Sequence, residues 1–467
     1  MARATLLILF AIGVAFAVMA IGQQGKVVIS WPGYVIEMKA IFALIVFAAI
    51  LPLIWFVGLV IDAPGRMGAM SARAKARKGQ ESLARGLIAA ESGEFEDARR
   101  HAAAATELIE EPRLVALLEA RAAETAGDDP AAERAYTGML THEDTELLGR
   151  KGLMQIALKR GDRAAACDHA AAAMKLSKAA DWPFLSLFEL RVQTFDWELA
   201  IDALDEGEKR KFVDAKVAAR RRAVLLSAAA ARCERERRNE RAVDFAERAL
   251  RLAPGFAPAA VMAARLLADD SKLWKAQSVL EEAWETAPHP ALAHAYRDLK
   301  SDEPRAERAR RMAGLVELQP EHRESKILAA ELAMERGDWA AAQEALDSAF
   351  RDLPSSRICA LYAALSRARG DEPNARQWLA QAAVAPREAD WTDLDPDGPA
   401  FLYEDEDWAR LVYVFGDAGQ LIHPRLERGG RDAGAGSVLA LPPGLRAITD
   451  AQATPVRSGP TVTRAAG

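Results

Sequence analysis

The sequence predicts an all-α protein in which two N-terminal membrane-spanning helices precede a long array of stacked helical hairpins. Three observations predict this class: two uncharged apolar runs near the start, a pattern that recurs along most of the chain, and an alanine-rich composition with only 7% aromatic residues. At 467 residues the chain is longer than one hydrophobic core usually supports. Tandem repeats solve this problem because each unit buries the open face of the next.

The two apolar runs predict a transmembrane hairpin within residues 1–65. Residues 4–22 and 40–61 contain no charged side chain, and each run is long enough to cross about 30 Å of hydrocarbon as a helix. Cations are denser after the second run than between the runs, which places both chain ends and the repeat array on the cytoplasmic side. The alternative for the first run is a cleavable signal peptide. The cations expected to meet lipid in the basic segment 66–78 are Arg66, Arg73, Lys75, Arg77 and Lys78.

The segment between the runs contains two β-prone stretches that flank Pro32 and Gly33. This pattern predicts a short hairpin outside the cytoplasm. An open loop is the alternative, because Pro-Gly favours turns whose twist fits a tight hairpin poorly. We expect Trp31 and Tyr34 to lie at the membrane interface, where amphipathic rings are enriched.

A glycine recurs with a spacing of 34 residues at Gly93, Gly127 and Gly161, and the next step reaches Phe195. Small residues precede and follow each glycine, and an aromatic residue often comes soon after it. This arrangement is typical of the tetratricopeptide repeat, and it predicts about nine hairpins over residues 79–390, interrupted by a charged insertion at 206–216. The residues expected to pack the repeats are Gly86, Gly93, Phe95, Ala98, Gly127, Ala132, Tyr136, Gly161, Ala166, Trp197, Ala200, Ala242, Ala276, Gly337, Trp339, Ala342, Gly370 and Ala375.

The C-terminal part falls into two segments. Residues 391–428 are acidic and aromatic, and we expect them to cap the last hairpin, whose open face must be hidden from water. Residues 429–467 contain too few apolar side chains to order themselves, which predicts a disordered tail. Within the first segment Asp393, Asp395, Asp397 and Glu404 have the spacing of a calcium-binding loop. Nearby prolines and the absence of a second loop favour an acidic turn over a calcium site, so we expect no cofactor.

The motifs of several enzyme classes are absent from the sequence. It contains no glycine-rich phosphate loop, no GxSxG and no HExxH, so we expect a protein that is not an enzyme. The net charge of −6 argues against nucleic acid as a partner. The cysteines Cys167, Cys233 and Cys359 lack metal-ligand spacing, and we expect them to be buried as small apolar side chains.

Stacked hairpins of this kind form a superhelix with a concave groove. We expect the groove to bind protein partners through charged and aromatic side chains on the first helix of each hairpin. The alternative is a rigid spacer without a binding role.

The whole arrangement resembles the HemY family of proteobacterial inner-membrane proteins. The features that carry the resemblance are the two spans, the segment Gly25-Lys-Val-Val-Ile29, the segment Tyr34-Val-Ile-Glu37, the basic run after Ile61 and the repeat array. The resemblance implies a membrane-bound helper of protohaem biosynthesis in the bacterial inner membrane, with haem-biosynthesis enzymes and membrane lipid as partners and no catalytic residues. Two alternatives stay open: direct binding or transfer of porphyrin or haem, and a tetratricopeptide protein of envelope assembly.

Overall fold

In this computed structural model, residues 26–39, 72–109, 112–300, 302–388 and 400–423 are described, together with Ile12 and Phe42. The chain divides into two compact units, Met1–Thr145 and Glu146–Gly467. Apart from Ile12 and Phe42, the predicted spans at 4–22 and 40–61 lie outside the described residues, as do Arg66 and the predicted tail at 429–467. Among the described helices none is both long and apolar enough to cross a bilayer.

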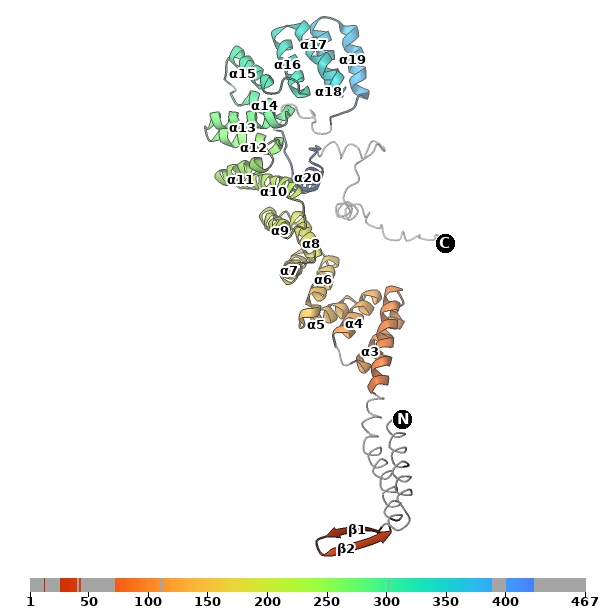
Figure 1. Cartoon of the computed structure of the whole chain (residues 1–467). Helices are drawn as coiled ribbons and strands as arrows, with labels where there is room; N and C mark the ends of the chain where they lie inside the picture. Colours follow the sequence, from red (N-terminus) through yellow and green to blue (C-terminus); the bar gives the residue numbers. More distant parts are fainter. Residues whose placement is uncertain are drawn as a thin grey trace, which may run out of the picture. The chain divides into compact units, whose positions relative to one another are not determined.

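The segment between the two apolar runs is an antiparallel β-hairpin (Figure 1). Strands β1 (Lys26–Trp31) and β2 (Tyr34–Lys39) pair in a register that sets Ile29 opposite Ile36 and Trp31 opposite Tyr34. Gly33 turns the chain with a φ of +96°, a conformation that glycine adopts without steric conflict. The hairpin, and not the open loop, is therefore the correct alternative. Trp31 and Tyr34 are 75% and 78% exposed, and their contact with a membrane stays a prediction.

The first unit contains a helix at residues 72–91 followed by α3 (Phe95–Leu108), α4 (Pro112–Ala126) and α5 (Asp129–Met139). Small residues let these helices approach closely: a Cβ atom on Gly86 would lie 2.7 Å from Leu118 Cδ2. This first helix already includes residue 72, but its residues 72–78 are exposed and burial begins at Gly79. The basic residues Arg73, Lys75, Arg77 and Lys78 are exposed on this helix.

The second unit continues the array. Its helices are α6 (Glu143–Lys159, which starts in the first unit), α7 (Arg163–Leu176), α8 (Trp182–Gln193), α9 (Trp197–Lys209), α10 (Ala215–Arg235), α11 (Asn239–Leu252), α12 (Ala257–Asp269), α13 (Leu273–Thr286), α14 (Pro290–Asp298), α15 (Arg305–Leu318), α16 (Arg323–Arg336), α17 (Trp339–Asp352), α18 (Ser356–Ala368), α19 (Glu372–Val384) and α20 (Asp405–Ala418). Within the described residues the helices before α20 pair into nine hairpins, as the repeat spacing predicts. Even-numbered helices from α4 to α18 are the first helices of their hairpins.

The turn inside most hairpins contains one residue with a left-handed backbone. Gly93, Gly127, Gly161, Gly337 and Gly370 have φ values between +72° and +81°. Phe195, Arg237 and Ser271 occupy the equivalent turns with φ near +60°, although a side chain disfavours this conformation by roughly 1–2 kcal/mol. The stacking of the hairpins therefore imposes the turn even where glycine is missing.

The charged insertion predicted at 206–216 is built mainly into the ends of helices and does not form a separate long loop. Its first residues complete α9, and Asp214 caps α10 by accepting a hydrogen bond from the Lys216 amide (2.8 Å). The additional residues lengthen α10, which has 21 residues where α12 has 13. Charged side chains suit this change because they stay on the solvated side of a helix.

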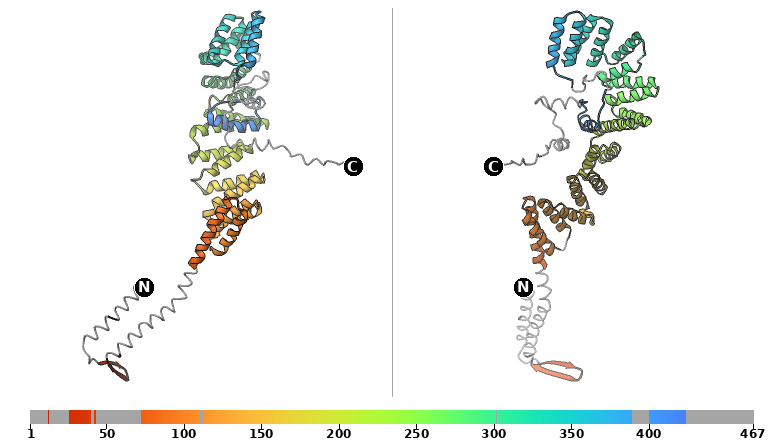
Figure 2. Two further views of the ribbon diagram at one scale, coloured as in Figure 1. Left: turned by 90° about the vertical axis from the view of Figure 1, so that its right-hand side faces the viewer. Right: turned by 180° about the vertical axis from the view of Figure 1, so that it is seen from behind.

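The acidic and aromatic C-terminal segment does not cover the last hairpin in its described part, residues 400–423. Helix α20 packs instead against α10, with a smaller contact to α8 (Figure 1, Figure 2). Trp408, Leu411 and Val412 are 0–1% exposed and belong to the core shared by α8, α10, α12 and α14. The apolar surface of these first helices is thus the surface that the segment hides from water.

Candidate functional site

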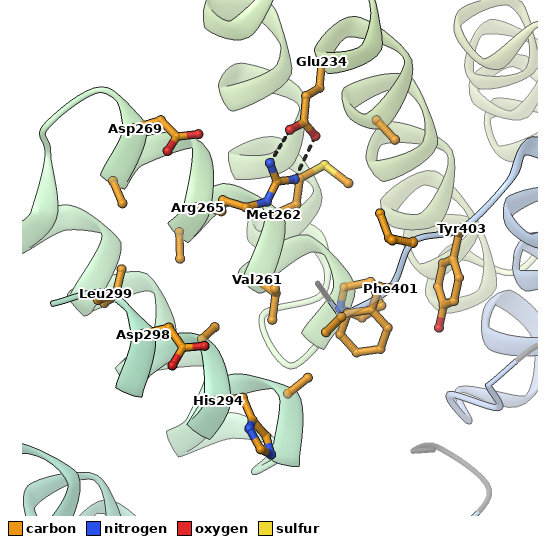
Figure 3. A pocket seen from close by; sticks show the side chains of 18 of the residues that line it. Glu234, Val261, Met262, Arg265, Asp269, His294, Asp298, Leu299, Phe401 and Tyr403 are labelled. Atoms are coloured by element: carbon orange, nitrogen blue, oxygen red, sulfur yellow. Dashed lines mark hydrogen bonds and ion pairs between the residues drawn. The ribbon is translucent and has the colours of Figure 1, made fainter. Parts of the chain in front are cut away.

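The first helices α8, α10, α12 and α14 form a continuous surface in the second unit, which we call the first-helix face. Helix α20 covers its α8–α10 end. Beside α20 lies a cavity of about 1000 Å³, lined by α10, α12, α14 and the start of the C-terminal segment at residues 400–403, with Trp408 of α20 (Figure 3). A volume of this size lies within the range of ligand and peptide sites in proteins.

The cavity combines an apolar surface with charged edges. Val261, Met262 and Leu299 line it from the array, and Phe401 and Tyr403 line it from the C-terminal segment. Small side chains on α12 and α14 leave the space open. Their list is Ala264, Ala268, Ala291 and Ala295.

Charged groups stand around this apolar surface. Arg265 on α12 donates to both carboxylate oxygens of Glu234 on α10, with 2.8 Å between Nη2 and Oε2. This hydrogen bonding to Glu234 raises the pKa of Arg265. Asp269 and Asp298 lie on the α12 and α14 sides of the same cavity. A partner with an apolar anchor and a few polar groups would meet complementary chemistry here.

His294 on α14 lines the cavity and also a second, small void of about 30 Å³ between α14, α15 and α16. Burial, together with the neighbouring cations Arg297 and Arg357, lowers the pKa of His294 to about 4. Its Nδ1 atom lies 2.8 Å from Arg297 Nη2. The imidazole is therefore neutral at pH 7. Glu331 lines the small void from α16, and burial raises the pKa of this carboxyl group.

The start of the C-terminal segment is fixed by aromatic contacts. The Phe401 ring packs against the His289 ring at the beginning of α14, with 5.5 Å between centroids. Tyr403 meets Trp408 edge to face at 5.1 Å, and both side chains are largely buried. These contacts hold one wall of the cavity to the array.

A second cluster lies further along the array, where the chain leaves α19. Arg357 donates to Glu324 (2.7 Å) and Glu388 (3.3 Å), and Arg323 pairs with the same two carboxylates. The four side chains are 6–17% exposed. Burial alone would raise the pKa of Glu388, but Arg357 and Arg323 lower it overall. The Ser356 amide also donates to the Pro386 carbonyl oxygen (2.9 Å), so residues 386–388 are tied to the start of α18.

The predicted repeat residues form the framework of the hairpins in both units. The buried members are Gly86, Ala98, Ala132, Tyr136, Ala166, Trp197, Ala200, Ala242, Ala276, Ala342 and Ala375. The glycines Gly93, Gly127, Gly161, Gly337 and Gly370 occupy the turns, and Trp339 is half-buried. Phe95 is not buried as the pattern predicts: it is 48% exposed at the first position of α3.

None of these framework residues lines the cavity. The repeat pattern therefore identified residues that pack the hairpins together, but it did not identify the residues that line the cavity. The sequence did not predict that Glu234, Arg265 and His294 line a cavity, because nothing in their spacing distinguishes them from other polar residues of the helices. The aromatic content of 391–428 was the one available signal for Phe401 and Tyr403.

The calcium-loop hypothesis stays a prediction, because Asp393, Asp395 and Asp397 lie outside the described residues. Glu404 is described and forms a reciprocal capping box with Asp407 at the start of α20. In this box the Glu404 amide donates to Asp407 Oδ2 (3.2 Å). A helix cap explains this carboxylate without a metal ion.

The buried state of the three cysteines agrees with expectation: Cys167, Cys233 and Cys359 are 1–2% exposed free thiols. Burial raises the pKa of each thiol, which keeps them protonated and unreactive at neutral pH.

Sequence comparisons identify one family and one curated relative to which the chain is similar. Residues 25–127 match the family described as HemY protein N-terminus. The probable magnetosome protein Mms48 of Magnetospirillum gryphiswaldense is 25% identical over 370 residues, which cover 77% of this chain and 80% of that protein.

Two solved tetratricopeptide structures are also similar. A repeat protein from Parabacteroides merdae has 14% identity and a TM-score of 0.25, covering 54% of this chain and 93% of its own. The TPR2AB-domain:pHSP90 complex of yeast Sti1 has 16% identity and a TM-score of 0.29, covering 66% of this chain and 99% of its own. Because these TM-scores are low, the fold assignment rests on the hairpins themselves.

Proposed function

We propose that this chain, whose residues 25–127 carry the N-terminal region of the HemY family, is a membrane-anchored tetratricopeptide scaffold that binds a protein partner on its first-helix face. Its role is to hold enzymes of protohaem biosynthesis at the cytoplasmic side of the bacterial inner membrane. The repeat array supports a protein-interaction scaffold, and the family supports the link to haem biosynthesis.

The observation that carries the proposal is the cavity of about 1000 Å³ between α10, α12, α14 and the C-terminal segment. A spacer would need only buried contacts between successive hairpins. This face instead presents an open apolar surface with charged groups at its edges. Such a mixture favours an anchor side chain surrounded by oriented polar contacts.

Site-specific photo-cross-linking in the full-length protein tests the proposal. A photoreactive residue is placed at Val261 or Asp269 in the cavity, or at Trp274, which is 77% exposed on the second helix α13 and serves as the control. We expect discrete adducts at the two cavity positions, identified by mass spectrometry as haem-biosynthesis enzymes, and none at the control. Identical adducts at all three positions, or none in the cavity, would contradict a partner site there. Adducts with envelope-assembly proteins would shift the assignment to that alternative.

The membrane anchor is a separate part of the proposal. It is supported by the uncharged runs at 4–22 and 40–61 and by the exposed cations of the helix at 72–91. Cysteines introduced at Tyr34 and Arg77 report on orientation, because the native cysteines are buried. An impermeant maleimide applied to spheroplasts should label position 34 and leave position 77 unlabelled until the membrane is opened. Labelling of position 77 in intact spheroplasts would refute the orientation.

Direct binding of haem or porphyrin is the second candidate, and His294 is the observation that favours it. A neutral imidazole that lines the cavity, with Arg265 and Arg297 nearby, is the kind of group that ligates haem iron and pairs with propionates. Titration of the full chain with haem should then shift the Soret band, and His294→Ala should remove this shift. Cross-links in the cavity without any spectral change would leave the scaffold as the function.

A further inference from the structure

Helix α20 sits on the array in the way that an amphipathic helix sits in a binding groove. Trp408, Leu411, Val412 and Phe415 recur at positions i, i+3, i+4 and i+7, which places them along one side of the helix. The first three are buried, and the Phe415 ring lies 4.4 Å from the Phe256 ring at the start of α12. This apolar side faces α8, α10 and α12.

Charges on α10 match the two ends of α20. At the first turn, Asp405 pairs with Arg235 (2.6 Å) and Arg232 (3.5 Å). At the last turn, Arg220 donates to the carbonyl oxygens of Gly416 (2.8 Å) and Asp417 (2.6 Å). A carboxylate is favourable in the first turn of a helix such as α20, and here it also pairs with two cations. At the helix end the last carbonyl groups lack partners within the helix, so a cation there can pair with their negative partial charge by donating hydrogen bonds. The arrangement fixes both the position and the direction of the docked helix.

The contact between α20 and the array is nevertheless incompletely satisfied. The Trp408 indole nitrogen and the Tyr413 hydroxyl are buried and have no hydrogen-bond partner among the described residues. Each such group typically costs about 1–3 kcal/mol. The apolar contact and the paired ends favour docking, whereas these two groups oppose it. A helix with the same apolar side but without buried polar atoms would bind this surface better.

We propose that α20 occupies the binding surface of a partner helix on α8, α10 and α12, and competes with that partner from within the chain. This inference rests on the proposed protein-binding role of the first-helix face. The partner helix has a carboxylate in its first turn, which meets Arg232 and Arg235, and aromatic or aliphatic residues at i, i+3, i+4 and i+7. The cavity beside α20 is the open end of the same surface, at which the partner begins to bind.

The competition has a quantitative consequence. A tethered segment acts at an effective concentration that is commonly millimolar. A free helix can bind only those molecules in which α20 is undocked. Its apparent Kd therefore increases by about the ratio of the docked population to the undocked population. A change that releases α20 without altering α8, α10 or α12 should tighten binding in trans.

Gly416 offers such a change. A Cβ atom at this position would lie 2.5 Å from Arg221 Cγ, so Gly416→Ala forces α20 away from α10 while the array keeps its own sequence. Alanine also favours the helical conformation, so α20 itself stays helical. Gly314→Ala on α15 is the matched control, because no atom lies within 4 Å of the added carbon.

The probe is a fluorescent synthetic peptide of residues 400–423, titrated into each full-length protein by anisotropy. We expect Gly416→Ala to bind at least about 10-fold more tightly than the wild type and Gly314→Ala. A peptide carrying Asp405→Lys should lose most of this affinity. Hydrogen exchange should show faster amide exchange in α20 of Gly416→Ala and unchanged protection in α12 and α16, which verifies that the array remains folded.

A second variant tests the same competition if Gly416→Ala does not release α20. Asp405→Lys within the full chain removes the pairing at the first turn of α20 and should also increase binding of the wild-type peptide. Equal peptide affinity in all proteins, although exchange shows α20 released, would overturn the proposal. Continued protection of α20 in both variants would overturn it as well. If the peptide binds more tightly to the released variants but no cross-links form in the cavity, the proposed function is contradicted. The inference that this surface binds a helix would still hold in that case.

Discussion

The C-terminal part of the chain returns to the array at two places, and the two contacts differ in chemistry. Residues 386–388 meet α16 and α18 through the buried ion network of Arg323, Glu324, Arg357 and Glu388. Helix α20 meets α8 and α10 through an apolar side, with charges only at its ends.

The two contacts depend on different kinds of interaction. Removing one member of a buried ion network leaves the remaining charges with fewer partners, so a rearrangement that breaks the network is costly. The free energy of an apolar contact is roughly proportional to the buried apolar area and has no preferred direction. Such a surface can therefore bind any helix whose apolar side fits it. The network therefore fixes the chain after α19, whereas the surface beneath α20 suits exchange of one helix for another.

Trp408→Ala should have the largest effect, and it breaks the apolar contact. Trp408 is 1% exposed, and truncation of a buried tryptophan typically destabilises by about 3–5 kcal/mol. Because stability in repeat arrays is local, the measurement is the opening free energy of α20 and α10 amides by hydrogen exchange. Leu402→Ala, at a position that is 72% exposed, is the control and should change these values by less than about 0.5 kcal/mol. Equal effects of the two substitutions would show that α20 does not depend on its apolar side.

Arg357→Met should have the next largest effect, and it breaks the ion network. The substitution leaves Glu324 and Glu388 with fewer partners, which we expect to destabilise α16 and α18 locally by about 2–4 kcal/mol. Arg113→Met removes an exposed pair with Asp144 and should cost less than about 1 kcal/mol. Exchange in α20 should stay unchanged in Arg357→Met. A loss of protection in both regions would show that the two contacts are coupled.

The stability of α14 should depend on pH, and this dependence tests the region between the two contacts, where His294 lies. Its pKa is lowered to about 4 by burial and by Arg297 and Arg357, while Asp298 opposes the shift and His289 adds to it. The unfolded state therefore binds more protons than the folded state between about pH 4 and pH 6.5. Stability is fully present above pH 6.5 and is lost as the pH falls toward 4, by about 1–3 kcal/mol. His294→Gln should flatten this part of the exchange-derived stability profile of α14, and a wild-type profile without the loss would contradict neutral His294.

The smallest expected effects concern the turns of the hairpins. Ser271→Gly should stabilise the α12–α13 hairpin by about 0.5–1 kcal/mol, because serine at a φ of +60° is strained. Gly161→Ala should destabilise the α6–α7 hairpin by about 1 kcal/mol for the opposite reason, since the φ of Gly161 is +76°. The two variants are each compared with the wild type by hydrogen exchange of the flanking helices. Opposite signs are required, and effects of one sign would show that packing and not backbone strain dominates these turns.

Local patterns were sufficient to predict the hairpins but not the site. The spacing of Gly93, Gly127 and Gly161 carried the repeat forward to Phe195, whose backbone adopts the same left-handed conformation without glycine. The sequence also suggested a capping role for the aromatic C-terminal segment, but it placed the cap on the wrong hairpin. Which apolar surface a segment covers depends on contacts between residues about 170–200 positions apart, and no local pattern records them.

Sequence alone was enough to predict the helical repeat architecture, the β-hairpin at Pro32 and Gly33, and the burial of alanines along most second helices, because these features follow from contacts between near neighbours in the chain. Only the tertiary structure decided that α20 lies on α10, that Glu388 completes an ion network with Arg357, and that His294 lines a cavity. These features depend on how distant helices meet, and the local spacing of the residues involved does not record which helix will be their neighbour.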